Sequence, residues 1–333
     1  MKTILPIPEQ PRFRILLPER VKFACGTAVE RTPTGMKLVR NGTTLAISAM
    51  AAAWDALDDA LNERGIGLAT SDLSVIWSQL LERLATTGML VDAAHFSGSH
   101  GTVRSDARIP ALNAVVTILD KIYEETLVRF PVGSAIDRFI AGEFDSASAV
   151  KWLIENYHYT KSASYHVAPM LQHDMDPEER ELWLRFLKDE SWHWRIYRPA
   201  LHQFELTYAE LDARDPLPPT RHLIETLHSI ADKGPIAYAA AMIFIERPPL
   251  WTDLHLDPLY TSLMKFYGFS QATVRPLWWH ATENLSAGHS ALGVVVISHR
   301  RTLSLHQVDE AVAAVRDTIH AVSEWQEGIL NER

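Results

Sequence analysis

The alternation of apolar and polar positions in the first ninety residues predicts short strands followed by helices. Residues 21–24, 28–31 and 36–39 have strand-like composition. Asn41 and Gly42 both tolerate the positive φ of a hairpin turn, which predicts a returning strand at residues 43–47. Helical spacing follows at residues 49–64 and 72–86, and residues 88–91 are typical of a closing strand. This order is typical of a small winged-helix-like module.

From residue 111 onward the chain shows helical spacing only, and several helix ends can be located. Ser146 or Ser148 can cap a helix that runs to about residue 168, where Pro169 ends it. Asp176 and Pro177 begin the next helix, because proline is favoured at the first helical position. Further boundaries are indicated at Thr220, at Gly234 with Pro235, at Glu246, at Ser270, and at Ser304 with Gln307 as a capping box. About seven helices are predicted.

The chain is long enough for two hydrophobic cores, with 333 residues of which 47% are hydrophobic. We therefore expect an α+β protein of two domains. A winged-helix-like domain at residues 17–93 is followed by a linker at 94–110, which has a Gly- and Ser-rich composition. An all-α bundle then occupies residues 111–333.

Composition narrows the function classes. A net charge of −9 without a basic stripe argues against nucleic acid as a partner. Cys25 is the only cysteine, so an internal disulfide, a cysteine zinc site and an iron–sulfur cluster are excluded, and a reducing cytoplasm is expected. Residues 1–13 lack the apolar run of a secretory signal. The longest apolar stretch, residues 235–245, is too short for a bilayer of ~30 Å, so no membrane partner is expected.

Two segments share one spacing of a carboxylate and an imidazole, Glu155 with His158 and Glu190 with His193. Residues three apart project from the same face of a helix, so each pair can direct both ligands to one point. Helix bundles use this arrangement to bind two iron or manganese ions. Solvent exposure is the alternative for the first pair, because the residues that share its face are polar.

Glu246 ends an apolar helix, and His280 with Glu283 repeats the spacing in reverse order. A hydrogen-bonded core histidine is the alternative for His280. His289 comes nine residues after His280, nearly opposite on an ideal helix. It can join the same site only if Gly288 or a π-bulge rotates it.

Ordinary ion pairs are the alternative for the two carboxylates on apolar faces. Glu190 lies on the apolar stripe of its helix, where a carboxylate is costly unless it is paired or bound to metal. Arg195 or Arg198 could provide such a pair. Arg247 could pair with Glu246 in the same way.

The second half of the chain resembles the haem-oxygenase-like di-iron oxidases and oxygenases, relatives of the thiaminase-like and pyrroloquinoline-quinone-synthase-like bundles. The segments that carry the resemblance are residues 139–143 (FIAGE), 155–159 (ENYHY), 189–193 (DESWH), 243–246 (IFIE) and 280–289. The resemblance implies a seven-helix bundle from about residue 139 to 330. It also implies that the firmest metal ligands are Glu155, His158, Glu246 and His280. In the last motif Asn284 and Ala287 replace the family's ligands, which leaves Glu283, His289, Glu190 and His193 as competitors for the remaining places.

The function implied by this resemblance is that of an iron-dependent non-haem oxidase or oxygenase. Carboxylates and neutral imidazoles suit Fe(II), because they leave open positions for dioxygen. Two ions are expected, with manganese as an alternative to iron. The implied substrate is an amino acid, free or carried on a peptide, in natural-product biosynthesis. In relatives the motif that matches Glu190 and His193 often lies outside the metal's ligands, and the resemblance then implies that these two residues support the site instead of binding metal.

The first domain resembles the small winged-helix domains that bind leader peptides in ribosomal-peptide pathways. The segments concerned are residues 17–21 (LPERV), 41–42 (NG) and 80–90 (LLERLATTGML). The resemblance implies a leader peptide bound by strand addition to a sheet edge. A structural cap or a dimerisation domain is the alternative, and a homodimer stays open.

Two other functions remain in competition. One is a metal-free oxidase or hydrolase on the same bundle, in which the glutamates and histidines act as acids and bases. The other is a non-catalytic, peptide-binding scaffold.

Overall fold

The computed structural model describes residues 17, 20–32, 35–48, 68–69, 75–92, 108–246, 253–286 and 288–331. The chain divides into two compact units. The first comprises Met1–Tyr123 with Val294–Val312, and the second comprises Glu124–Gly293 with Ala313–Arg333. The predicted domain limits of 17–93, 94–110 and 111–333 stay predictions.

The first unit contains the strands expected near its beginning. Strands β2 (Ala28–Thr32), β3 (Gly35–Arg40) and β4 (Thr43–Ser48) form an antiparallel meander, and β1 (Arg20–Phe23) lies between β5 (Leu68–Ala69) and β6 (Leu90–Asp92). The β3–β4 turn is at Asn41 and Gly42, which have φ values of 48° and 73°, so the hairpin prediction is confirmed. Helix α2 (Val75–Thr86) confirms the second expected helix. The first, at residues 49–64, lies outside the described residues, and the winged-helix resemblance stays a prediction.

A two-stranded pairing adds to this unit. Strand β7 (Arg108–Pro110) pairs with β8 (Thr302–Ser304), and Leu303 at its centre is fully buried. The expectation of helices alone after residue 111 is therefore wrong at β8. The strand stops where Ser304 and Gln307 exchange backbone-to-side-chain hydrogen bonds, which begins helix α15 (Leu305–Asn331) as the capping box predicted.

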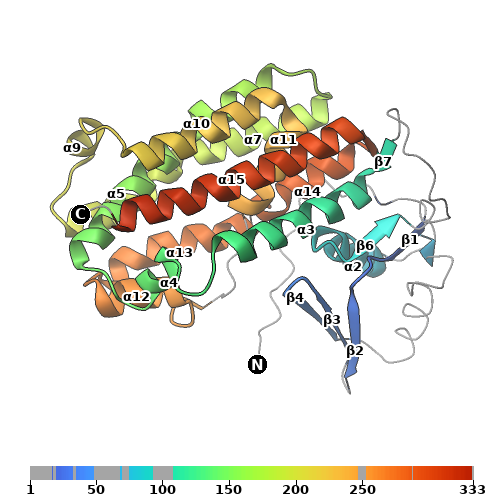
Figure 1. Cartoon of the computed structure of the whole chain (residues 1–333), viewed down its shortest axis with the longest axis horizontal. Helices are drawn as coiled ribbons and strands as arrows, with labels where there is room; N and C mark the ends of the chain where they lie inside the picture. Colours follow the sequence, from blue (N-terminus) through green and yellow to red (C-terminus); the bar gives the residue numbers. More distant parts are fainter. Residues whose placement is uncertain are drawn as a thin grey trace. The chain divides into compact units, whose positions relative to one another are not determined.

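Helices make up the rest of the described chain, and there are more of them than the seven expected (Figure 1). In chain order they are α3 (Ala111–Arg129), α4 (Ala135–Ile140), α5 (Ser146–Lys161), α6 (Ala163–Val167), the 3-10 helix η2 (Ala168–Gln172), α7 (Pro177–His193), the 3-10 helix η3 (Trp194–Tyr197), α8 (Arg198–Gln203), α9 (Tyr208–Asp212), α10 (Pro218–Lys233), α11 (Pro235–Ile245), α12 (Pro258–Phe266), α13 (Gln271–Ser286), α14 (His289–His299) and α15.

The extra helices arise where single residues break longer runs. The helix expected from residue 146 to 168 divides at Ser162, whose hydroxyl donates to the Tyr159 carbonyl at 2.6 Å and so competes with the helical hydrogen bond. Asp145 caps α5 by accepting from the Ser148 amide, in place of Ser146 or Ser148. The predicted start of α7 at Asp176 and Pro177 is confirmed.

Helix α11 is buried within the second unit and ends at the candidate site. Every residue from Pro235 to Phe244 is buried. Its alanines allow close packing, and a side chain placed at Gly293 would come within 2.2 Å of the Ala239 carbonyl oxygen. Glu246 follows the last residue of this buried helix and is its C-cap.

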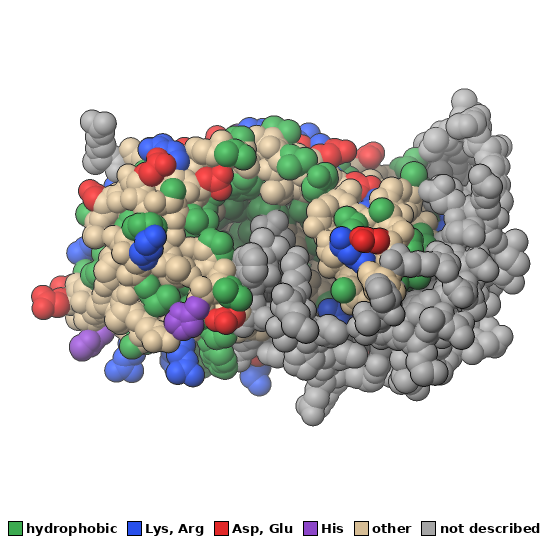
Figure 2. Space-filling view, turned by 90° about the horizontal axis from the view of Figure 1, so that it is seen from below, with side chains coloured by type: hydrophobic (Ala, Val, Ile, Leu, Met, Phe, Trp, Pro, Cys, Tyr) green, Lys and Arg blue, Asp and Glu red, His purple; other side chains and the backbone are tan. Residues whose placement is uncertain are grey.

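On the described part of the face in Figure 2, basic and acidic side chains are interspersed among apolar ones. Among the described residues, no helix combines the length and apolar character that a membrane span needs.

Candidate metal centre

Five side chains with carboxylate or imidazole groups gather inside the second unit. His193 Nδ1 lies 2.8 Å from Glu190 Oε1 and 2.9 Å from His280 Nε2. His289 Nδ1 approaches the same Glu190 oxygen at 3.2 Å. Glu246 completes a second group with Glu190 and His289, and all three of these residues are buried. Glu190 is therefore common to both groups.

Four of these five residues lie at helix ends, and His280 lies within a helix. Glu190 and His193 occupy the last turn of α7, and Glu246 caps α11. His280 comes from α13. Gly288 adopts a φ of 81° between α13 and α14, so His289 begins a new helix and turns toward Glu190. The change of direction at Gly288 is the one that His289 needed, according to the sequence, to join the same site as His280.

Burial and hydrogen bonding set the charges in the cluster. Burial opposes ionisation of Glu190, but hydrogen bonds from His193 and His289 lower its pKa to about 2. Burial raises the pKa of Glu246 to about 8, and the Glu190 carboxylate adds to this rise. Burial, reinforced by His193, lowers the pKa of His280 to about 4. The cluster therefore offers one ionised carboxylate and a neutral imidazole at neutral pH.

The donor set fits one or two divalent cations. The ligand atoms within each group lie within 4.8 Å of one another. Ligands ~2.1 Å from one ion and at right angles to each other would be ~3.0 Å apart, which matches the contacts of 2.8 to 3.2 Å among Glu190 and the three histidines. Glu190, His193 and His280 form a set of two histidines and one carboxylate, the combination that binds non-haem Fe(II) with open positions. Without a metal ion, one N–H at His193 Nδ1 would have to serve both the Glu190 carboxylate and His280 Nε2. One cation could instead bind Glu190, His193 and His280 together.

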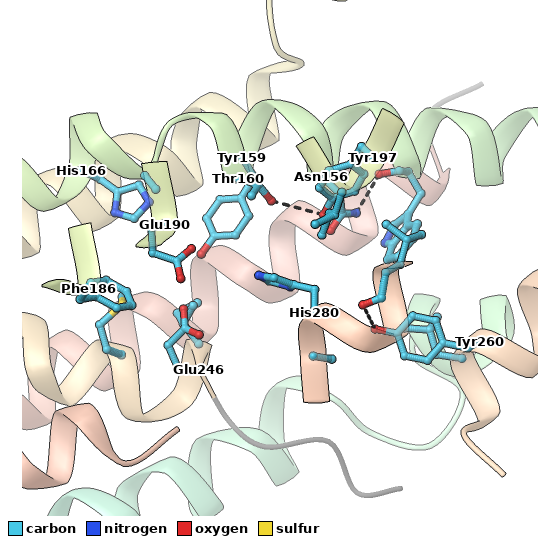
Figure 3. A pocket seen from close by; sticks show the side chains of 18 residues that line it. Asn156, Tyr159, Thr160, His166, Phe186, Glu190, Tyr197, Glu246, Tyr260 and His280 are labelled. Carbon is cyan, nitrogen blue, oxygen red and sulfur yellow. Dashed lines mark hydrogen bonds between the residues drawn. The ribbon is translucent and has the colours of Figure 1, made fainter. Parts of the chain in front are cut away.

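A cavity of about 270 Å³ adjoins these residues, with Glu190, Glu246 and His280 in its wall (Figure 3). This volume is near the lower limit of small-molecule pockets, ~300 Å³. Away from the cluster, the wall consists of neutral groups, among them Trp152, Tyr197 and Tyr260. Such a cavity can hold a small molecule or one side chain beside a bound metal ion.

Helices α5 and α6 contribute to this cavity through side chains that were not predicted as metal ligands. Asn156, Tyr159, Thr160 and His166 line it. Tyr159 and Thr160 lie three and four residues after Asn156 and so form one stripe of α5 with it, and His166 follows on α6. This stripe was visible in the sequence, but its polar and aromatic residues matched no ligand pattern.

Glu155 and His158, expected among the firmest ligands, are not brought to this cluster. The Glu155 carboxylate accepts hydrogen bonds from the Leu217 amide at 3.0 Å and from the Thr220 hydroxyl, at the start of α10. It therefore serves as a cap for that helix. His158 is buried outside the cluster, and this burial lowers its pKa. The next largest influence on its pKa is the charge of Asp212 of α9, which raises it. The one-residue offset between these positions and the cavity-lining stripe corresponds to a rotation of ~100° about α5.

Three other residues were expected as ligands or ion-pair partners. The Glu283 side chain and Arg247 lie outside the described residues, although Glu283 falls within α13. Arg195, considered as an ion-pair partner of Glu190, instead stacks over the Trp192 ring at 3.8 Å. Glu190 pairs with histidines and not with this arginine.

No protein-family model matches the chain, and no curated protein is significantly similar to it in sequence. Among solved structures it resembles a domain of unknown function with a haem-oxygenase-like fold from Shewanella denitrificans OS217, with a TM-score of 0.51 and 17% identity over 66% of this chain and 90% of that one. It also resembles a TenA homolog from Pseudomonas syringae pv. tomato str. DC3000, with a TM-score of 0.50 and 14% identity over 71% of this chain and 99% of that one. At such identities the likeness concerns the fold, and it confirms the expected haem-oxygenase-like fold.

Proposed function

We propose that this chain is a non-haem, iron-dependent oxidase or oxygenase with a two-metal site. The observation that carries the proposal is the position of Glu190, which is shared by two groups of three metal-ligating residues beside a cavity. One ion would be held by Glu190, His193 and His280. The other would be held by Glu190, Glu246 and His289. All five residues are among the ligands predicted from the sequence, whereas Glu155 and His158 are left out of the proposed set.

The protein's contribution is to hold these ligands and to keep the site dry. Bound Fe(II) would supply the capacity to bind and reduce dioxygen. Glu190 is held ionised by His193 and His289, so this shared carboxylate would offer a negative charge to a cation. Glu246 must lose its proton when a cation binds, because burial keeps it protonated at neutral pH. Phe186 and Tyr159 place aromatic rings in the cavity wall beside the cluster.

The cavity favours a small or peptide-borne substrate. A volume of about 270 Å³ accommodates one amino-acid side chain and excludes a folded peptide. Among the described lining residues no arginine or lysine is present, so a free carboxylate would meet no cationic side chain there. An amino acid carried on a peptide has no free α-carboxylate within the chain, and we therefore favour it over a free amino acid. A leader peptide on the first unit would fit this proposal.

The test is metal analysis together with oxygen consumption. Protein produced with added iron should contain about two iron ions per chain, and removal by a chelator should abolish oxygen uptake driven by a reductant. Reloading with Fe(II) should restore it. Oxygen uptake that persists in fully metal-free protein would contradict the proposal.

A metal-free hydrolase is the second candidate, and a hydroxyl group in the cavity wall supports it. Such an enzyme needs a nucleophile or a general base in the cavity. Among the described lining residues the aliphatic hydroxyl is that of Thr160, which lies 3.3 Å from the Tyr197 hydroxyl. Turnover without metal that is lost in Thr160→Val would support the hydrolase.

A further inference from the structure

A buried histidine and tyrosine form a pair next to the candidate metal centre. His166 of α6 and Tyr238 of α11 come from different helices, and their side chains meet with His166 Nδ1 2.8 Å from the Tyr238 hydroxyl. Tyr238 is fully buried and His166 is 4% exposed. His166 nevertheless lines the cavity, and Figure 3 shows its ring beside Glu190. Neither residue belongs to the two groups of metal ligands.

The direction of this hydrogen bond follows from the chemistry of the two groups. A buried hydroxyl must donate its hydrogen to an acceptor, and among the described residues the Tyr238 hydroxyl has His166 Nδ1 as its hydrogen-bond partner. The phenol therefore donates and Nδ1 accepts. In a neutral imidazole the ring proton then resides on Nε2. Burial lowers the pKa of His166 to about 4, which keeps the ring neutral at physiological pH.

The surrounding rings hold the pair in place. The Tyr159 ring stacks on His166 with an interplanar angle of 8° and centroids 6.0 Å apart. Trp183 packs edge-on against Tyr238 at 5.5 Å. Rotation of the imidazole would disturb its stacking on Tyr159 and break its hydrogen bond with Tyr238, so these contacts favour one orientation of the ring.

We propose that Tyr238 fixes His166 in its Nε2–H tautomer, so that His166 presents a hydrogen-bond donor to a small oxygen- or nitrogen-bearing molecule bound in the cavity beside Glu190 and Glu246. Tyr238 is then a positioning residue that acts through His166. The role in ligand binding rests on the proposed metal site, whereas the tautomer does not. Because a protonated nitrogen cannot coordinate a cation, His166 stays available to the bound molecule when metal is present.

The first experiment reads the tautomer directly in metal-free protein. Histidines labelled with ¹⁵N are observed by long-range ¹H–¹⁵N correlation at pH 8, above the ordinary histidine pKa of ~6.5. His228 supplies an internal reference of the opposite kind, because its Nδ1 lies 3.1 Å from the Tyr165 carbonyl oxygen, which only accepts. We expect Nε2–H at His166 and Nδ1–H at His228. Tyr238→Phe, which keeps the ring and its packing, should convert His166 to a tautomer mixture. An Nδ1–H tautomer in the wild type, or no change in Tyr238→Phe, would overturn the proposal.

The second experiment measures the donor role with azide as the small-molecule probe. Protein loaded with cobalt(II) is titrated with azide, and binding is followed through the visible cobalt bands. Loss of one hydrogen bond in His166→Phe should weaken azide binding about 5-fold, the equivalent of ~1 kcal/mol. The matched control His228→Phe, which alters a histidine outside the described cavity wall, should bind azide as the wild type does. Equal azide affinity in His166→Phe would refute the donor role. Failure of cobalt to bind would instead contradict the proposed metal site, and the tautomer measurement would still decide the role of Tyr238.

Discussion

Glu190→Gln is the substitution that separates a metal ligand from a buried structural carboxylate. Glutamine preserves the shape of the side chain but cannot act as an anionic bridge between two ions. Loss of a residue behind a metal ligand costs ~10–100-fold in affinity, so loss of a shared ligand should exceed 100-fold for both ions. The variant should therefore retain almost no iron after dialysis.

The cost in stability without metal can be worked from the same contacts. The fall of the Glu190 pKa from 4.5 to about 2 corresponds to ~3 kcal/mol in favour of the ionised carboxylate in the folded protein. The hydrogen bonds from His193 and His289 cause this fall, and a neutral amide does not reproduce it. We expect Glu190→Gln to lose about 2–3 kcal/mol of unfolding free energy in metal-free protein.

Glu155→Gln is the matched control, because Glu155 is equally buried in a helix of the same unit. It accepts from Leu217 and Thr220 at the start of α10, so its loss should also cost ~1–3 kcal/mol. Yet this variant should keep both iron ions. Iron per chain is measured by elemental analysis, and stability by urea unfolding followed by circular dichroism.

Two results would refute the reasoning. Full iron retention in Glu190→Gln would remove the bridging ligand on which the site is built. Complete iron loss in a folded Glu155→Gln protein would restore Glu155 as a ligand, as the motif originally suggested, and would require a different arrangement of α5.

Three further predictions concern the same unit. Glu246→Gln should lose one of two iron ions. In metal-free protein burial raises the pKa of Glu246 from 4.5 to about 8, so the stability contributed by its protonated form is complete below about pH 4.5 and is lost as the pH rises to 8. Glutamine does not titrate, so this variant should flatten the pH dependence of Tm between pH 5 and 8. An unchanged slope would contradict the burial of this carboxyl. His193→Phe should lose metal whereas His158→Phe should keep it, and equal iron content in the two folded variants would reject the new ligand set. Gly293→Ala should cost ~1–3 kcal/mol, measured by urea unfolding, because its methyl group would collide with the Ala239 carbonyl oxygen, and a stability equal to the wild type would show that α11 and α14 can separate freely.

Local patterns in the sequence predicted many individual features correctly. Asn41 and Gly42 indicated a hairpin turn, and Asp176 with Pro177 indicated the start of α7. Ser304 with Gln307 formed the capping box, and residues 234–235 separated α10 from α11. Each of these features depends on the backbone preferences or hydrogen bonds of residues within one helical turn, so no distant part of the chain was needed.

The sequence by itself determined that helices would present glutamate and histidine one turn apart, and this holds for Glu190 and His193. Only the tertiary structure decided which such pair enters the cluster. Spacing along a helix states which residues share a face but not the direction of that face, and a step of one residue turns it by ~100°. On α5 this step places Asn156 and Tyr159 in the cavity wall and turns Glu155 toward the start of α10, a contact with a residue 62 positions away in sequence.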